Sequence, residues 1–378
     1  MQFKKVIIYF LTWRVLLFVF LFLAIQLLPL QFDFIGGGLS EYLKKPQLWA
    51  WANFDGEHFL QIAKGGYSDL TYFFFPGLPL FIRFMNFFGG TLIAFLKTGL
   101  VVSNVSLILA LIGVYKLVSK DFKEKTARNT IFLILLFPTS FYLGSVYSES
   151  LFLAMVVWSF YLARSNKWIA SGVLASLSAI TRLVGVGMFP ALICEAYLTR
   201  KDKDFNLKQT LLGLFIIPLG IIFYMYFLYS STGDPLDFLH TVGIYGPQRS
   251  STFILLPQVF YRYIFKILPS VSYNYFPAVF VTYLEFITGA VFSLLGLIGL
   301  WKLRLSYSIF LLMGLVLPSL SGSFSSMPRY VIVLFPAFIL LSLYLEKAGK
   351  FIRYLVYSLL FLSLGLATAL FVRGYWVS

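Results

Sequence analysis

The segment WANFDGEHFLQIAKGGY, residues 51 to 67, carries the polar side chains best suited to chemistry in the first third of the chain. Asp55 and Glu57 are separated by one glycine, His58 follows, and aromatic residues lie on both sides. Aromatic side chains favour the membrane interface, where a carboxylate loses part of its water and becomes a stronger base. Asp55 is therefore a candidate general base, although the spacing also fits an Asp that caps a helix over 56–64.

Further charged residues lie at the predicted outer ends of apolar segments. Glu149 in SVYSESLFL fits either a role in the site or an interfacial helix cap. Arg182 lies inside the apolar run SAITRLVGVG, where an ionisable group costs roughly 2.5–3.5 kcal/mol and is expected to face a wet cavity with a partner. With Arg249 and Arg329 it could bind a phosphate, because guanidinium forks match phosphate oxygens. The alternative is scattered contact with lipid headgroups.

Other chemistries have little support in the sequence. The chain has two histidines, His58 and His240, and no HExxH or CxxC motif, so we expect no metal site. Walker, Rossmann and GxSxG patterns are also absent, which argues against nucleotide-driven transport and serine hydrolysis. The single Cys194 cannot form an intrachain disulfide.

The elements that must position these residues are predicted to be membrane helices. About 60% of the residues are hydrophobic and 12% are charged, and apolar runs near twenty residues recur from end to end. Long unbroken runs fit helices and not the alternating strands of a barrel. We expect an all-α polytopic bundle. The net charge of +15 then reflects positive cytoplasmic loops, and no nucleic-acid partner is expected.

The apolar pattern predicts about eleven membrane-spanning helices. They are expected near 6–30, 91–117, 130–145, 149–164, 168–182, 183–198, 209–231, 277–300, 306–321, 330–345 and 354–373. The first is expected to be a retained helix with a cytoplasmic N-terminus, because it is too long for a signal-peptide core.

The distribution of bases predicts the topology. Roughly 18 Lys and Arg residues, among them Arg164 and Arg304, fall in loops on the N-terminal side, against about 11 on the other side. This places two long segments, 31–90 and 232–276, on the non-cytoplasmic face. The stretch 72–88 is apolar but broken by prolines, and is expected to lie at the membrane surface.

Several motifs in order resemble one family. FDGEHFLQIAKGGY followed by FFFPGLPL is similar to the first signature of PIG-V-type mannosyltransferases, which resemble GPI mannosyltransferase II. FPTSFYLGSVYSESLFL, AITR, TGDPLDFLH with YGPQR, and LSGSFSSMPRYVIVLFPAFILL resemble its later motifs. The resemblance spans nearly the whole chain and suggests a prokaryotic homologue. One departure is Phe54, where the family usually has Trp before the Asp.

The resemblance implies a single transmembrane domain over 1–378 of the GT-C glycosyltransferase type. It implies a polyprenyl-phosphate sugar as donor, often mannose, a lipid or glycan acceptor, and no cofactor. The active site would face away from the cytoplasm, at the cell membrane of a prokaryote or the endoplasmic reticulum of a eukaryote. Asp55 would be the catalytic carboxylate, with Glu57, His58 or Glu149 orienting the acceptor. The donor phosphate would be bound by Arg182, Arg329 and Arg249.

Three other functions stay open at this point. A transporter of lipid-linked sugars would be expected to show internal symmetry between two halves, and none is visible. A non-catalytic subunit would not need Asp55. An enzyme of the same fold could use another sugar, or a protein or cell-wall glycan as acceptor, and this is the strongest competitor.

Overall fold

The computed structural model describes residues 2–68, 71–245, 248–250 and 252–377, and nearly all of them are helical or in short turns. The chain folds into two compact units. Unit 1 comprises Met1–Thr71, Leu78–Ala154 and Leu341–Val377, and unit 2 comprises Tyr72–Gly77 and Met155–Leu340. The predicted all-α class is confirmed. Gly246 and Pro247 of the YGPQR motif lie outside the described residues.

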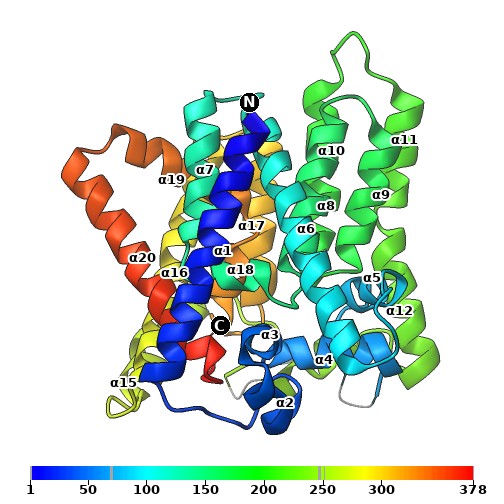
Figure 1. The fold of residues 1–378 in the computed structure, drawn as a ribbon. Coiled ribbons are helices and arrows are strands. Elements are labelled where there is room, and N and C mark those ends of the chain that lie inside the picture. The colour runs from blue at the N-terminus through cyan, green and yellow to red at the C-terminus, as the bar shows by residue number, and fades with distance from the viewer. Residues whose placement is uncertain (1, 69–70, 246–247, 251, 378) are drawn as a thin grey trace. The chain divides into compact units, whose positions relative to one another are not determined.

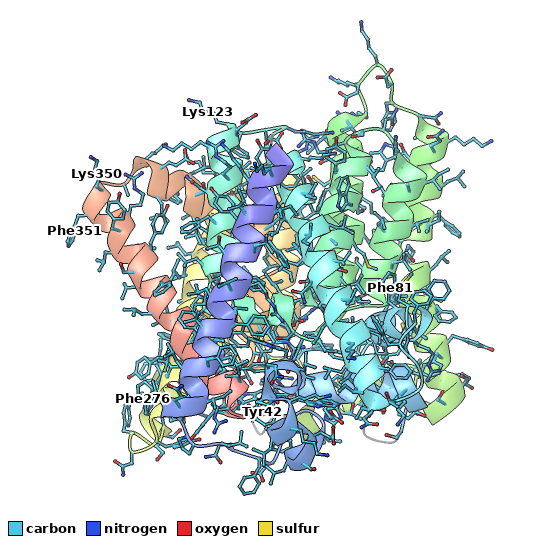
Figure 2. All side chains as sticks on the ribbon, viewed as in Figure 1. Tyr42, Phe81, Lys123, Phe276, Lys350 and Phe351 are labelled. Atoms are coloured by element: carbon cyan, nitrogen blue, oxygen red, sulfur yellow. The ribbon has the colours of Figure 1, made fainter. Side chains whose placement is uncertain are left out.

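Unit 1 consists of four long helices and a set of short ones. The elements are α1 (Gln2–Leu27), α2 (Gly38–Lys44), α3 (Pro46–Trp49), η1 (Ala50–Ala52), α4 (Asp55–Gly65), α5 (Gly77–Phe84), α6 (Leu92–Val118), α7 (Glu124–Leu136), η2 (Ser140–Gly144) and α20 (Lys350–Val372). Helix α1 packs against α20, α6 and α7. The short helices α2, α3 and α4 lie at the end of unit 1 opposite the N-terminus (Figure 1). Figure 2 shows Lys123 and Lys350 at the N-terminal end and Tyr42 at the other.

Unit 2 contains the remaining helices. They are α9 (Trp168–Ala179), η3 (Leu183–Gly187), α10 (Met188–Thr199), α11 (Leu207–Ile216), α12 (Leu219–Thr232), α13 (Asp237–His240), η4 (Val242–Tyr245), α14 (Leu256–Arg262), η5 (Tyr263–Ile267), α15 (Leu268–Ser270), α16 (Phe276–Lys302), α17 (Leu305–Ser319) and α18 (Met327–Val331). Two further helices, α8 (Glu149–Ala163) and α19 (Phe335–Lys347), begin in one unit and end in the other, and the first residue of α5, Gly77, belongs to unit 2.

Glycines allow the helices of unit 2 to approach closely. A Cβ atom at Gly172 of α9 would lie 2.1 Å from the carbonyl oxygen of Gly213 on α11. A Cβ atom at Gly220 of α12 would lie 2.1 Å from the carbonyl oxygen of Ser176 on α9. Small residues at such crossings are typical of membrane helices, where backbone contact replaces the hydrophobic effect as the source of attraction.

Five helical segments of the described chain are long and apolar enough to cross a membrane. They are Lys4–Leu27, Leu92–Val118, Leu207–Thr232, Phe276–Lys302 and Lys350–Val372. Four shorter apolar segments are Glu149–Ala163, Trp168–Ala179, Leu183–Thr199 and Leu305–Ser319. The structure thus supports a transmembrane protein, but the predicted number of about eleven spans is not confirmed.

Prolines explain two of the differences. The span predicted over 130–145 is interrupted because α7 ends at Leu136, and Phe137, directly before Pro138, is extended with φ −63° and ψ 142°. A proline disfavours the helical conformation of the residue before it. The span predicted over 330–345 is likewise split between α18 and α19, where Pro336 is the second residue of the new helix. Periodic hydrophobicity alone does not reveal these breaks.

The two segments predicted to lie outside contain short helices. The segment 31–90 holds α2 to α5, and the segment 232–276 holds α13 to α15. Helix α5 begins at Gly77, immediately after Pro76 in the stretch that we expect at the membrane surface. The face of the membrane on which they lie stays a prediction.

Candidate functional site

Asp55 is the first residue of α4 and follows a strained residue. Phe54 has φ 56° and ψ −121°, one of three non-glycine residues with positive φ in the described chain. Such a conformation in a bulky residue costs on the order of 1–3 kcal/mol and persists only when its surroundings enforce it. The buried ring packs against Phe34, Phe371 and Trp376, with ring centroids 5.0–6.0 Å apart. This packing sets the direction in which the chain enters α4.

The turn before Asp55 is also fixed by hydrogen bonds. The fully buried Asn53 donates from Nδ2 to the carbonyl oxygen of Phe371 at 2.8 Å, and its Oδ1 accepts from Gly36 N at 2.9 Å. The first amides of the helix, on Gly56 and Glu57, donate to main-chain carbonyls at 3.2 and 3.0 Å. The cap position of α4 belongs to Phe54, so the structure does not place Asp55 there. Asp55 itself is half-buried.

Glu57 and His58 lie on the same first turn of α4. Oε2 of Glu57 accepts from the amide of Gly37 at 2.8 Å, and Oε1 accepts from Nε2 of Gln61 at 2.8 Å. Glu57 therefore joins α4 to the chain before α2, which is a positioning contact. His58 is half-buried beside it.

Glu149 is the first residue of α8 and is completely buried. The two residues shortly before it are bonded to the chain that precedes Asp55. The amide of Val146 donates to the carbonyl oxygen of Trp51 at 2.8 Å. The hydroxyl of Tyr147 donates to the carbonyl oxygen of Asn53 at 2.7 Å. Within unit 1, these two hydrogen bonds therefore hold the segment before Glu149 beside the turn that leads into α4.

The three predicted arginines all meet one short segment of unit 2, Ser325–Tyr330. Arg182 lies in the extended break between α9 and η3, is buried, and has its guanidinium 5.3 Å from the ring centroid of Tyr330. Arg249 donates from Nη2 to Oγ of Ser326 at 2.9 Å. Arg329 belongs to the segment itself and is buried. Arginines up to nearly 150 positions apart in the chain therefore contact or belong to one short segment.

A buried acid, Glu285, is hydrogen-bonded to the segment Ser325–Tyr330. Glu285 of α16 accepts from the amide of Ser326 at 3.3 Å and from the hydroxyl of Tyr263 at 2.8 Å. Burial, with the nearby charge of Glu285, raises the pKa of Tyr263, so the phenol remains a hydrogen-bond donor. Ser326 has φ 65°, a second strained residue beside a candidate site.

Sequence reasoning missed Ser326, Tyr330 and Glu285 as supports of the arginines. Glu285 carried a usable signal, since an acid inside a long apolar helix needs a partner. Ser326 and Tyr330 carried none, because serine and tyrosine are common at helix ends. Among the described residues, no group of three His, Cys, Asp or Glu side chains could hold a metal ion.

Comparison with protein families gives one match. The family model described as Mannosyltransferase (PIG-V) matches residues 3–265. The matched range includes all the predicted site residues except Arg329, and it stops before the last motif noted in the sequence. No curated protein matches the chain.

Several solved structures of the oligosaccharyltransferase of Archaeoglobus fulgidus are similar to this chain. The complex with zinc and sulfate has 14% identity and a TM-score of 0.43, over 96% of this chain and 53% of that one. The form tethered to an acceptor peptide has 13% identity and a TM-score of 0.41, over 96% and 55%. The complex with an inhibitory peptide and a dolichol-phosphate has 14% identity and a TM-score of 0.40, over 97% and 56%. The chain spans about half the length of these structures.

Proposed function

The chain belongs to the mannosyltransferase (PIG-V) family, and on this premise we propose that it is a GT-C-type membrane glycosyltransferase. It transfers a sugar, with mannose expected, from a polyprenyl-phosphate donor to a hydroxyl of a lipid or glycan acceptor on the non-cytoplasmic face. The family match over residues 3–265 carries the proposal, because it includes Asp55 and the strained turn that presents it.

Asp55 acts as the general base. The acceptor oxygen forms a bond to the anomeric carbon while its proton passes to the carboxylate of Asp55. The bond between the anomeric carbon and the phosphate oxygen breaks, and the electron pair leaves with the lipid phosphate. This leaving group is a stable anion, so no paired general acid is needed, unlike in glycosidases. The half-buried position of Asp55 leaves its carboxylate within reach of an acceptor.

The arginines bind the donor phosphate. Arg182, Arg249 and Arg329 supply fixed positive charge, which stabilises the charge that develops on the leaving phosphate. The ring of Tyr330 and the hydroxyl of Ser326 hold two of the guanidinium groups in place beforehand. His58 and Glu149 orient the acceptor, and Glu57 acts through its hydrogen bonds by holding the start of α4.

The direct test is a transfer assay with purified protein. It would be given a panel of polyprenyl-phosphate sugars and membrane extracts as acceptors, and the products would be identified by mass spectrometry. We expect a mannosylated product, abolished in Asp55→Asn and retained in Asp33→Asn, which changes an exposed acid of the same segment. Transfer of another sugar, or to a protein or cell-wall glycan, would correct the specificity. Wild-type transfer by Asp55→Asn would refute the mechanism.

A further inference from the structure

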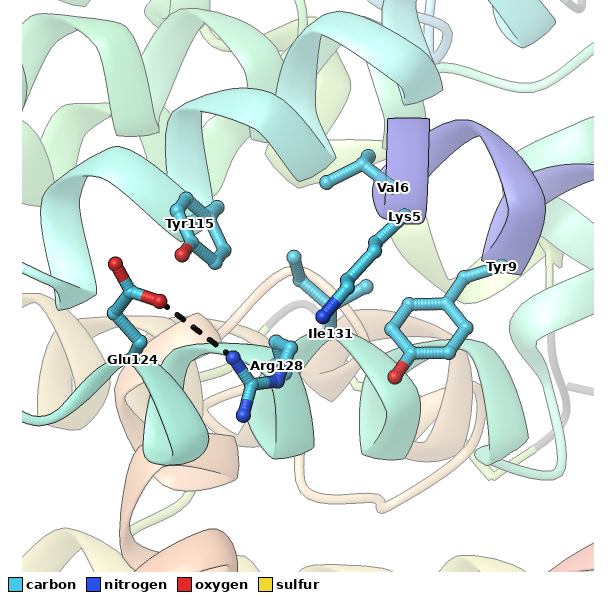
Figure 3. Close-up of a pocket in the computed structure, with 7 residues that line it drawn as sticks. All are labelled: Lys5, Val6, Tyr9, Tyr115, Glu124, Arg128 and Ile131. Carbon is cyan, nitrogen blue, oxygen red and sulfur yellow. Dashed lines mark ion pairs between the residues drawn. The ribbon is translucent and has the colours of Figure 1, made fainter. Parts of the chain in front are cut away.

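A cavity lies in unit 1, at the end that carries the N-terminus. It has a volume of about 300 Å³ and is enclosed by α1, α6 and α7. Figure 3 shows Lys5 and Tyr9 of α1 facing Tyr115 of α6 and Arg128 of α7 across this space. A cavity of this size can hold a phosphate with a small organic group attached.

The cavity is separate from the site around Asp55. Gly99 of α6 lies against Val146, because a Cβ atom there would be 2.9 Å from Cγ1 of Val146, and Val146 is bonded to Trp51. Tyr115 lies about 24 Å further along the same helix, at a rise of about 1.5 Å per residue. A ligand in this cavity would therefore occupy a different place from the acceptor at Asp55.

The charges that line the cavity favour an anion. Lys5 and Arg128 are cations, and Glu124 is the one acid that lines it among the described residues. Oε2 of Glu124 lies 3.6 Å from Nη1 of Arg128, and the carboxylate of Glu124 also accepts a hydrogen bond from the hydroxyl of Tyr115, so Glu124 offsets one of the two cations and leaves the lining with a positive excess. No carboxylate of the described chain forms an ion pair with Lys5. The guanidinium fork, the ammonium group and the phenol hydroxyl of Tyr9 together offer donors that a phosphate accepts.

The position of the cavity favours a lipid as the source of this phosphate. Lys5 lies at the start of the membrane-spanning segment Lys4–Leu27, at headgroup level. Ile8, Leu11 and Val15 continue from it as an exposed apolar face of α1, on which an acyl or prenyl chain could lie. Val6 and Ile131 form an apolar wall of the cavity itself.

We propose that this cavity binds the phosphate of an anionic lipid headgroup, held by Lys5 and Arg128 with the hydroxyl of Tyr9. The site does not depend on the glycosyltransferase proposal, because no residue of the cavity takes part in transfer.

Native mass spectrometry of the full chain from nanodiscs of mixed phosphatidylglycerol and phosphatidylcholine would test the site. We expect wild type to retain phosphatidylglycerol, and Lys5→Gln/Arg128→Gln to retain at least about tenfold less, as expected for the loss of two charged hydrogen-bond donors. Lys350→Gln/Arg353→Gln removes equal charge from α20 of the same unit and should bind as wild type does. Equal loss in both double variants, or no loss in the first, would overturn the proposal.

Two further measurements keep the result interpretable. The single variant Lys5→Gln leaves the Glu124–Arg128 pair intact. It should retain several-fold less phosphatidylglycerol without a change in melting temperature. Inorganic phosphate would be titrated into wild type in neutral detergent. Phosphate binding that depends on Lys5 but is not displaced by phosphatidylglycerol would identify a free phosphate as the ligand and overturn the lipid source.

Discussion

Asp55 in unit 1 and Glu195 in unit 2 are acids beside apolar helices, and the structure surrounds them differently. Glu195 is completely buried and accepts from Nε and Nη2 of Arg304 at 2.7 and 2.8 Å, and from Oγ of Ser306 at 2.6 Å. Arg164 adds a second cation at 3.7 Å. Around Asp55 it is the main chain that is fixed, through Phe54 and Asn53, and the carboxylate itself stays half-buried.

We expect the difference to separate a structural acid from the proposed reactive one. The carboxylate of Glu195 accepts from three donors and lies beside two cations, so its oxygens are engaged within the protein. It joins α10 to the start of α17. Asp55 is only half-buried, and the strain lies in the neighbouring backbone at Phe54. Substitutions at the two acids should therefore have opposite effects on activity and stability.

The largest effect is expected for Asp55→Asn. The amide keeps the size of the side chain but cannot accept the proton, so kcat should fall by about 100- to 10,000-fold. The melting temperature should stay close to wild type, because the turn is held by Phe54 and Asn53. Initial rates and thermal melting in the same detergent would measure both. A variant that loses stability and activity together would place Asp55 with the structural acids.

Glu195→Gln should produce the reverse pattern. Removal of one partner from a buried ion pair costs about 3–5 kcal/mol, because the remaining charges stay uncompensated. The melting temperature should fall clearly, while the folded fraction should retain its rate within a few-fold. Glu41→Gln is the matched control, since it breaks an exposed pair with Lys44 worth at most about 1 kcal/mol. Equal melting temperatures of the two variants would contradict the structural role of Glu195.

Arg182→Met should chiefly weaken binding of the donor. Loss of a charged hydrogen bond to phosphate is worth about 1.5–3 kcal/mol, so KM for the donor should rise about 10- to 100-fold with KM for the acceptor unchanged. Arg200→Met is the control, because Arg200 also stacks on a tyrosine, Tyr197, but at an exposed surface. An unchanged donor KM in Arg182→Met would remove Arg182 from the phosphate site.

Phe54→Trp should have a smaller effect and would sharpen the role of the strained turn. The family usually carries Trp here, and the larger indole would have to fit the buried space beside Phe34 and Trp376, so the free energy of unfolding should fall by about 1–3 kcal/mol. Activity should stay within a few-fold. Phe54→Ala removes the packing that enforces the turn and should lose about 3–5 kcal/mol of stability. Similar losses in both variants would show that ring packing is not what maintains it.

The smallest effect is expected at the exposed pair Asp234–His240, 2.5 Å apart. The hydrogen bond from His240 and the amide of Leu236 lower the pKa of Asp234 below its ordinary value of 3.8. A lowered pKa stabilises the fold above the unfolded value, and this contribution is lost as the pH falls through the folded value. At this exposure Asp234→Asn should shift the melting temperature at pH 7 by at most about 2 °C, and this difference from wild type should disappear as the pH falls below the folded pKa of Asp234. A larger shift at pH 7 would mean that the pair is more than a surface contact.

Much of the fold could be predicted from apolar runs, and its breaks could not. The helices Leu92–Val118 and Phe276–Lys302 agree with the predicted spans within one or two residues. The interruption after Leu136 was missed because the hydrophobic pattern continues through Pro138. A run of apolar residues reports burial or contact with lipid, and it does not report whether the backbone remains helical throughout.

The candidate site could be predicted in part for a similar reason. Asp55 and Arg182 are visible in the sequence because charged groups in apolar surroundings need an explanation. No sequence pattern indicates that Glu195 is a paired acid, and the distribution of bases predicts only that Arg164 and Arg304 lie in cytoplasmic loops. Glu195 pairs with Arg304, 109 positions further along the chain, and with Arg164, which directly follows a different helix, α8, and no local pattern contains that information.

The sequence by itself determined the helical class, the apolar segments, the family and the choice of Asp55 as the candidate base. These depend on local composition and on short motifs, which are readable wherever they occur. The tertiary structure alone decided that Phe54 is strained and that three arginines meet at Ser325–Tyr330. It also decided that Glu195 is saturated by its partners. The physical reason is that strain, burial and ion pairing depend on which distant segments pack together.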